Sequence, residues 1–169
     1  MRVLLHKTWH DRHVMEVHRA DGTTLRRELE TRSTLRHDLM HWAFEHAAGL
    51  RDSFFGRLER GDDPDQGGGA MAVQPPGGPP PAEVHATEML VGMLQGAVAR
   101  AVEPGAFVAF AGEMLAQHGQ RTPAFFTPEL VRTVLAHYRQ LVGKWDSLRH
   151  GGVLQLEGTF AAPVSRRDD

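Results

Sequence analysis

The first 30 residues alternate between apolar and polar positions with a period of two, which is typical of β-strands that have one buried face. A tight turn is predicted at Asp21 and Gly22, because glycine readily adopts the positive φ that a hairpin turn needs. The pattern predicts a three-stranded antiparallel meander over residues 2–30, with the third strand at 23–29. The positions that carry the alternation in the first two strands are Val3, Leu5, Val14, Glu16 and His18.

After residue 30 the apolar positions recur every three or four residues, which is the spacing of amphipathic helices. A first helix is predicted to begin at Ser33 or Thr34, since either side chain can cap exposed backbone N–H groups, and to end near Leu50. A short helical piece is expected to follow at residues 51–60. Both segments precede the only long interruption of the pattern.

Three more helices are predicted in the second half of the chain. The one at 83–102 is apolar nearly all round and is therefore expected to be the most buried element. A second is expected at 106–118. The last has the clearest start, with Thr127 as its N-cap and Pro128 at its first helical position, and its apolar stripe continues to about residue 148.

Two further segments complete the prediction of the fold. Glycine and proline dominate residues 62–82, so this segment is predicted to be a flexible surface insert. Residues 153–157 alternate again and predict a fourth strand, which must pair with the meander because a lone strand is not stable. We therefore predict a single α+β domain over residues 1–169, in which a four-stranded antiparallel sheet packs against about four helices.

The composition narrows the class of protein. Of the 169 residues, 41% are hydrophobic and 24% are charged, which is ordinary for a globular domain. The chain has no cysteine, which excludes disulfides and thiolate ligands and fits a reducing compartment, so we expect a cytoplasmic protein. The net charge of −2 gives no indication of a nucleic-acid partner, and no apolar run is long enough to predict a membrane span.

The 11 histidines are the most informative part of the composition, because histidine is the commonest metal ligand. On the first predicted helix, His37, His41 and Glu45 follow one another at intervals of four, so they share a face opposite the apolar positions. Two histidines at this spacing can bind one divalent ion, as in the HExxH helix of zinc proteases. Asp38 stands where that motif has its general base, with a side chain one methylene shorter.

A metal site on this helix would hold zinc or another divalent ion. His37 and His41 would be ligands, and Glu45 would be either a third ligand or a hydrogen-bond acceptor for His41. The sequence does not rank the candidates for a further ligand, which are His85, Glu88, Glu113, His118 and His137. The alternative is a structural row of solvated or hydrogen-bonded side chains. The four histidines of the meander are also expected to be solvated: His6, His10, His13 and His18.

Two stretches resemble a group of uncharacterised bacterial proteins. The first runs from His37 through Glu45 to the segment around Phe55, and it matches the patterns HDLxHxxxE and GLxxxFFGxL of that group. The second, KWDSLRHGGVLQL, matches the pattern RWxxLPxGGxLxL, except that Lys144 replaces the arginine and Arg149 the proline. The resemblance implies a shared fold, but it implies no activity.

These observations leave two functional hypotheses. The first, favoured because short motifs have low specificity, is a small intracellular, non-catalytic protein that binds a protein partner or a second copy of itself. The second is a divalent-metal-binding protein whose catalytic form would be a metal-dependent hydrolase with Asp38 as its base. A third protein ligand close to the two histidines would favour the second hypothesis. A row packed beneath other elements and bonded to backbone groups would favour the first.

Overall fold

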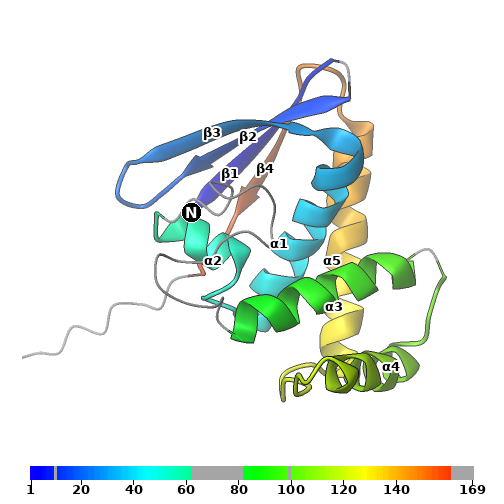
Figure 1. Cartoon of the computed structure of the whole chain (residues 1–169). Helices are drawn as coiled ribbons and strands as arrows, with labels where there is room; N and C mark the ends of the chain where they lie inside the picture. Colours follow the sequence, from blue (N-terminus) through cyan, green and yellow to red (C-terminus); the bar gives the residue numbers. More distant parts are fainter. Residues whose placement is uncertain (10, 62–81, 99, 161–169) are drawn as a thin grey trace, which may run out of the picture.

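The computed structural model describes residues 1–9, 11–61, 82–98 and 100–160. These residues contain the predicted four-stranded antiparallel sheet, with the strand order β3-β2-β1-β4, and the helices lie on one side of it (Figure 1). Its strands are β1 (Arg2–Lys7), β2 (Arg12–His18), β3 (Thr24–Glu30) and β4 (Val153–Glu157). Apart from residue 82, the predicted insert at 62–82 lies outside the described residues.

The alternation along the strands gives the sheet one apolar face, which packs on the helices. Val3 lies opposite Val17 on β2 and opposite Leu156 on β4, so the inward side chains of neighbouring strands are in register. This register turns the alternating apolar positions to the same side, whereas Leu4 and Val14 lie on the outer face. The buried apolar inward side chains of these three strands are Val3, Leu5, Met15, Val17, Leu154 and Leu156.

The histidine at the start of β2 departs from the expectation that the meander histidines are solvated. His13 occupies an inward position and has no exposed surface, and its ring packs edge-on against Trp145. Burial lowers the pKa of His13 to about 4, because a charged ring would lose its hydration. His6 and His18 do lie on the outer face and are partly exposed, whereas His10 lies outside the described residues.

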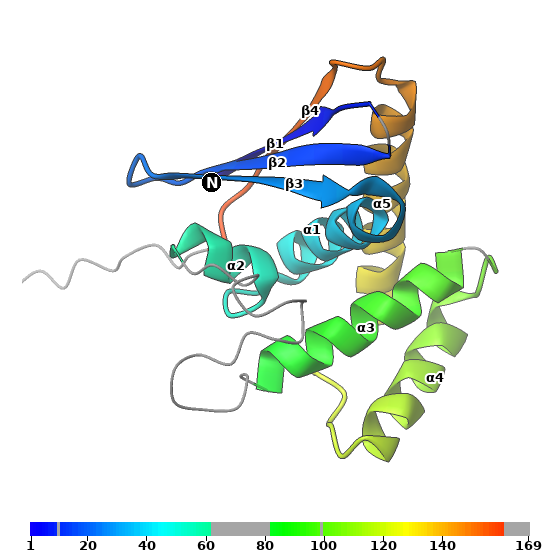
Figure 2. The same ribbon diagram turned by 45° about the horizontal axis from the view of Figure 1, so that its top comes forward.

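Five α-helices occupy the space beneath the sheet in the described part of the chain (Figure 2). α1 lies directly under the sheet, α5 runs beside α1, and α3 and α4 lie farther from the sheet. The short α2 confirms the helical piece expected at 51–60. A π-helical turn, Thr31–Leu35, leads from β3 into α1. The helices are α1 (Arg36–Ala48), α2 (Phe54–Glu59), α3 (Ala82–Val98), α4 (Pro104–Gln117) and α5 (Pro128–Ser147).

The beginnings of two helices show how far local chemistry fixes the fold. Thr127 caps α5 as predicted, since its hydroxyl accepts the backbone N–H of Leu130. The turn before α1 differs from the prediction that Ser33 or Thr34 is the cap. Glu30 caps it instead, because its carboxylate accepts two backbone N–H groups of the first turn.

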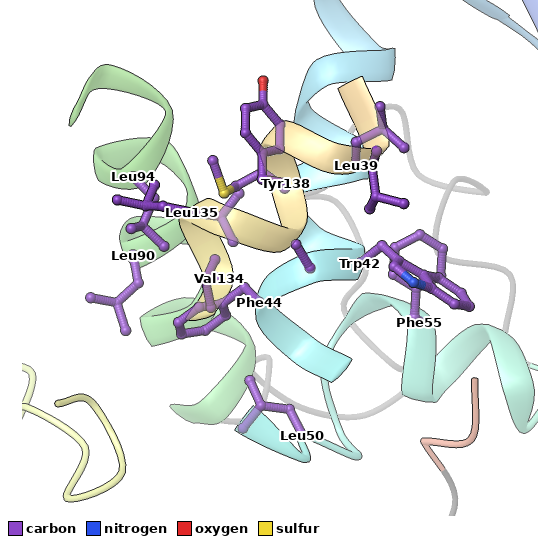
Figure 3. Close-up of a cluster of buried hydrophobic side chains, with 14 of the residues drawn as sticks. Leu39, Trp42, Phe44, Leu50, Phe55, Leu90, Leu94, Val134, Leu135 and Tyr138 are labelled. Atoms are coloured by element: carbon purple, nitrogen blue, oxygen red, sulfur yellow. The ribbon is translucent and has the colours of Figure 1, made fainter. Parts of the chain in front are cut away.

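α1 is buried more completely than α3, contrary to the expectation for the apolar helix at 83–102. All residues from 38 to 45 are buried, so α1 has packed neighbours on both sides. Figure 3 shows its side chains among those of α2, α3 and α5, with Trp42 against Phe55 and Phe44 turned toward Leu90. α3 keeps one exposed side, and the glycine that it carries at position 92 lies there.

Candidate metal centre

Two histidines of α1 and one glutamate of α3 converge where these helices meet. His37 and His41 are one turn apart on α1, and Glu88 reaches both of them from α3. The Nε2 atoms of the two histidines are 3.1 Å apart. Glu88 Oε2 lies 3.2 Å from Nε2 of His41 and 3.5 Å from Nε2 of His37. Three atoms that can each bind a metal ion therefore form a small triangle.

The triangle has the size that a divalent ion requires. Ligands at about 2.0–2.2 Å from a four-coordinate ion are separated from one another by about 3.3–3.6 Å. The observed separations of 3.1–3.5 Å need only small adjustments to reach this range. Three mutually adjacent ligands occupy one face of the coordination shell and leave the opposite side open, which is the arrangement of catalytic zinc sites and of the two-histidine, one-carboxylate triad.

Glu45 and Gln95 orient the two imidazole rings. Glu45 Oε1 lies 2.8 Å from Nδ1 of His41, and its other oxygen accepts the backbone N–H of Phe55 at 2.8 Å. The side-chain oxygen of Gln95 lies 3.2 Å from Nδ1 of His37. Because both Nδ1 atoms face oxygen acceptors, each ring in its neutral form would carry its proton on Nδ1 and turn an unprotonated Nε2 into the triangle, as a metal ligand must.

The centre requires a positive charge between the two Nε2 atoms and the Glu88 oxygen. With neutral rings, two nitrogen lone pairs and a carboxylate oxygen would face one another and repel. Burial by itself would lower the pKa of His41, but the hydrogen bonds and charges of Glu45 and Glu88 outweigh it and raise this pKa to about 10. Burial raises the pKa of Glu45, with His41 opposing the effect. A proton on His41 satisfies the centre, and a metal ion that takes its place would do the same.

The negative partner on α3 responds to the same charges. Burial would raise the pKa of Glu88, but hydrogen bonds from His37 and His41, together with their charges, lower it to about 2. Glu88 is therefore a carboxylate at neutral pH. An ionised carboxylate is the form that binds a metal ion.

The centre is closed toward the core and open on its outer side. The side chains of His41 and Glu45 are only 1% and 0% exposed, and the ring of Phe54 lies 5.8 Å from that of His41. The side chains of His37 and Glu88 are 28% and 13% exposed. Solvent therefore approaches the triangle beside His37 and Glu88, and an open coordination position would face this side.

The structure brings together the two predicted histidine ligands and selects one of the candidates for a further ligand. Among the described residues, Glu88 joins His37 and His41, and the other four candidates do not. Glu45 lies outside the group. Its two oxygens face Nδ1 of His41 and the backbone N–H of Phe55, so its geometry fits the acceptor role that the sequence allowed. Asp38 is buried and also lies outside the group. Its role as a base stays a prediction.

Two aspects of the centre were not anticipated from the sequence. The row on α1 was expected on the side opposite the core, but that side is itself packed, since α3 and α2 cover it and bury His41 and Glu45. The contribution of Gln95 was also missed. Its spacing of seven from Glu88 puts both residues on one face of α3, which is the signal that could have revealed it.

Comparisons with known proteins do not assign a family or a function to the chain. No family model matches the chain, and no curated protein or solved structure is significantly similar to it. In the part of the chain that the structure describes, no helix is long and apolar enough to cross a membrane. The function is therefore inferred from the chemistry of the centre.

Proposed function

We propose that the protein binds a divalent transition-metal ion through His37, His41 and Glu88. The observation that carries the proposal is the approach of three ligand atoms, from two helices, to within 3.5 Å of one another. Two imidazoles and one carboxylate suit zinc or iron(II) better than magnesium or calcium, which prefer oxygen ligands throughout. Zinc is the ion we favour, because the separations are close to those of tetrahedral ligands.

A purely structural role explains part of the arrangement. The row on α1 is packed under other helices, and Glu45 binds a backbone N–H group, as expected for such a role. A proton on His41 would complete such a network, because its Nε2–H then faces Glu88 and Nε2 of His37. We favour a metal ion over a non-catalytic interaction role because both Nδ1 atoms face outer acceptors. This leaves the two Nε2 atoms and one Glu88 oxygen, at the spacing of metal ligands, to bind a single ion.

A metal-dependent hydrolase is the catalytic form of the same proposal. Three protein ligands leave room for a water molecule, and zinc lowers the pKa of such a water to about 7. Asp38 is the residue that we propose as its base. Asp38→Asn would then abolish hydrolysis of ester or phosphoester probes while leaving the metal content unchanged. Equal hydrolysis by both proteins would remove Asp38 from this role.

The test is the metal content of protein purified without a chelator and without a metal-binding tag. We expect about one equivalent of zinc per chain in the wild type and almost none in Glu88→Gln, which removes the charge but keeps the size of the side chain. The double variant His37→Ala/His41→Ala should also lose the metal. Circular dichroism would show that these proteins remain folded.

Matched controls lie on exposed positions of α4 and its C-cap. Glu113→Gln and His118→Ala make the same chemical changes away from the centre, and both should keep the metal. The proposal fails if the wild type remains metal-free after incubation with zinc. It also fails if Glu88→Gln binds zinc as tightly as Glu113→Gln does.

A further inference from the structure

The exposed side of α3 next to the candidate metal centre carries glycines and therefore has no side chains there. Gly92 follows Glu88 by four residues and precedes Gln95 by three, so it lies on the edge of the face that carries both. Gly92 and Gly96 are exposed, and a Cβ on either would meet no atom within 4 Å. Side chains of a helix lean back over the preceding turn, so a larger residue at 92 would cover Glu88. Glycine leaves this carboxylate accessible.

An apolar cleft begins on the other side of this bare edge. It lies between α3 and α4 and has a volume of about 350 Å³, which is within the range of small-molecule sites. Gly96 lines the cleft and directly follows Gln95, which contacts His37 of the centre. The aromatic wall includes Phe110, whose exposed fraction of 51% is large for a phenylalanine. Its apolar lining residues are Met93, Gly96, Ala97, Val102, Phe107 and Phe110, and Arg100 completes the lining.

The centre and the cleft lie on opposite sides of α3. Figure 2 shows α1 on the side of α3 that faces the sheet and α4 on the side away from it. Gly92 and Gly96 lie between these two faces of α3, so a molecule that reaches from the centre to the cleft can cross the helix there. This is the exposed part of the helix that carries no side chain. Each glycine in a helix costs about 1 kcal/mol relative to alanine, so two of them here are unfavourable for the helix alone.

We propose that the ligand of the centre is a small amphipathic molecule with an oxygen-donor head, such as a carboxylate, and an apolar tail. This inference rests on the proposed metal site. The head would occupy the open coordination position, where a divalent ion with one bound carboxylate keeps a net positive charge. The tail would cross Gly92 and Gly96 and lie in the cleft against Phe107 and Phe110. A head group without a tail would bind the metal alone.

The experiment uses cobalt(II) in place of zinc and follows its visible spectrum during titration with acetate or octanoate. Both anions should shift the cobalt bands, and octanoate should bind at least about 100-fold more tightly, since each buried methylene adds about fourfold in affinity. Gly96→Leu should reduce the octanoate affinity at least tenfold and leave the acetate affinity unchanged. Phe110→Ser, which removes part of the cleft wall, should weaken octanoate alone.

Gly143→Leu is the matched control. Gly143 is an exposed glycine of α5 whose Cβ would also meet nothing within 4 Å, and the substitution should change neither titration. Equal affinities for acetate and octanoate, or an octanoate affinity that survives in both Gly96→Leu and Phe110→Ser, would overturn the inference while leaving the metal site intact. A cobalt spectrum that responds to neither anion would also overturn it. No cobalt spectrum at all would mean that the proposed function itself is wrong.

Discussion

Replacing His13 should remove a defined part of the acid sensitivity of the fold. The ring has no exposed surface, its Nδ1 lies 3.3 Å from the hydroxyl of Thr31, and its Nε2 has no hydrogen-bond partner among the residues that the structure describes. A proton on the ring would place a charge in this apolar site. Burial therefore lowers the pKa of His13 from 6.5 to about 4 in the folded protein.

The sign follows from which state binds the proton. The unfolded chain takes up a proton at His13 near pH 6.5 and the folded chain only near pH 4, so acidification between these values favours unfolding. Well above pH 6.5 the ring is neutral in both states, so it does not change the unfolding free energy. As the pH falls below this value, only the unfolded chain gains the proton, and the unfolding free energy declines. Linkage between these two pKa values gives a loss of about 2 kcal/mol of unfolding free energy between about pH 7 and pH 5.

The assay is urea unfolding of the wild type and of His13→Leu at these two pH values. Leucine fills much of the same volume and carries no titrating group, so the decrease in unfolding free energy on acidification should be smaller in the variant by about 2 kcal/mol. The exposed His118→Leu controls for the loss of any histidine and should behave as the wild type does. If His13→Leu and the wild type lose the same stability on acidification, the assigned pKa of His13 is wrong.

Two further substitutions test the hydrogen bond that orients His41 and the packing of α2. Glu45→Gln should lower the zinc affinity by about 10- to 100-fold, because the loss of a partner that orients a metal-bound histidine typically has an effect of this size. Competition with a chelator would measure the affinity. An unchanged affinity would exclude the orienting role of Glu45. Gly56→Ala should destabilise the protein by about 1–3 kcal/mol in thermal unfolding, because a Cβ there would lie 2.1 Å from the carbonyl oxygen of Arg51. The control Gly143→Ala, in open space, should be neutral or stabilising, and a neutral Gly56→Ala would contradict the packing of α2.

The sheet could be predicted because the patterns that specify its strands and turn lie within short segments of the sequence. Alternation fixes which side of a strand is buried, and the hairpin at Gly22 and the strand at 153–157 follow from short patterns. The cap of α5 was equally local. The cap before α1 is local too, but Glu30 accepts N–H groups only two and three residues ahead of it and takes the place expected for Ser33 or Thr34. The preference for serine or threonine at an N-cap, about 0.5–2 kcal/mol relative to alanine, therefore did not decide this start.

Only the part of the candidate site that lies on a single helix could be predicted from the sequence. His37 and His41 share a face of α1 because of helical geometry, and no tertiary contact is needed to see this. Glu88 lies 47 positions from His41, so its selection from five candidates depends on how α3 crosses α1. The burial of Glu45 depends on the same crossing and on α2, whose backbone supplies the N–H of Phe55.

The pairing of β1 with β4 has a consequence for the order of events during synthesis. β1, β2 and β3 emerge from the ribosome well before residues 153–157, which form the partner of β1 on its other edge. Until then β1 is an unprotected edge strand, and its inward side chains lack the neighbours that β4 provides. A sheet closed by its most distant strand has a high contact order, which slows folding. Between the synthesis of β3 and that of β4, the nascent chain therefore carries an open edge that is available to other chains.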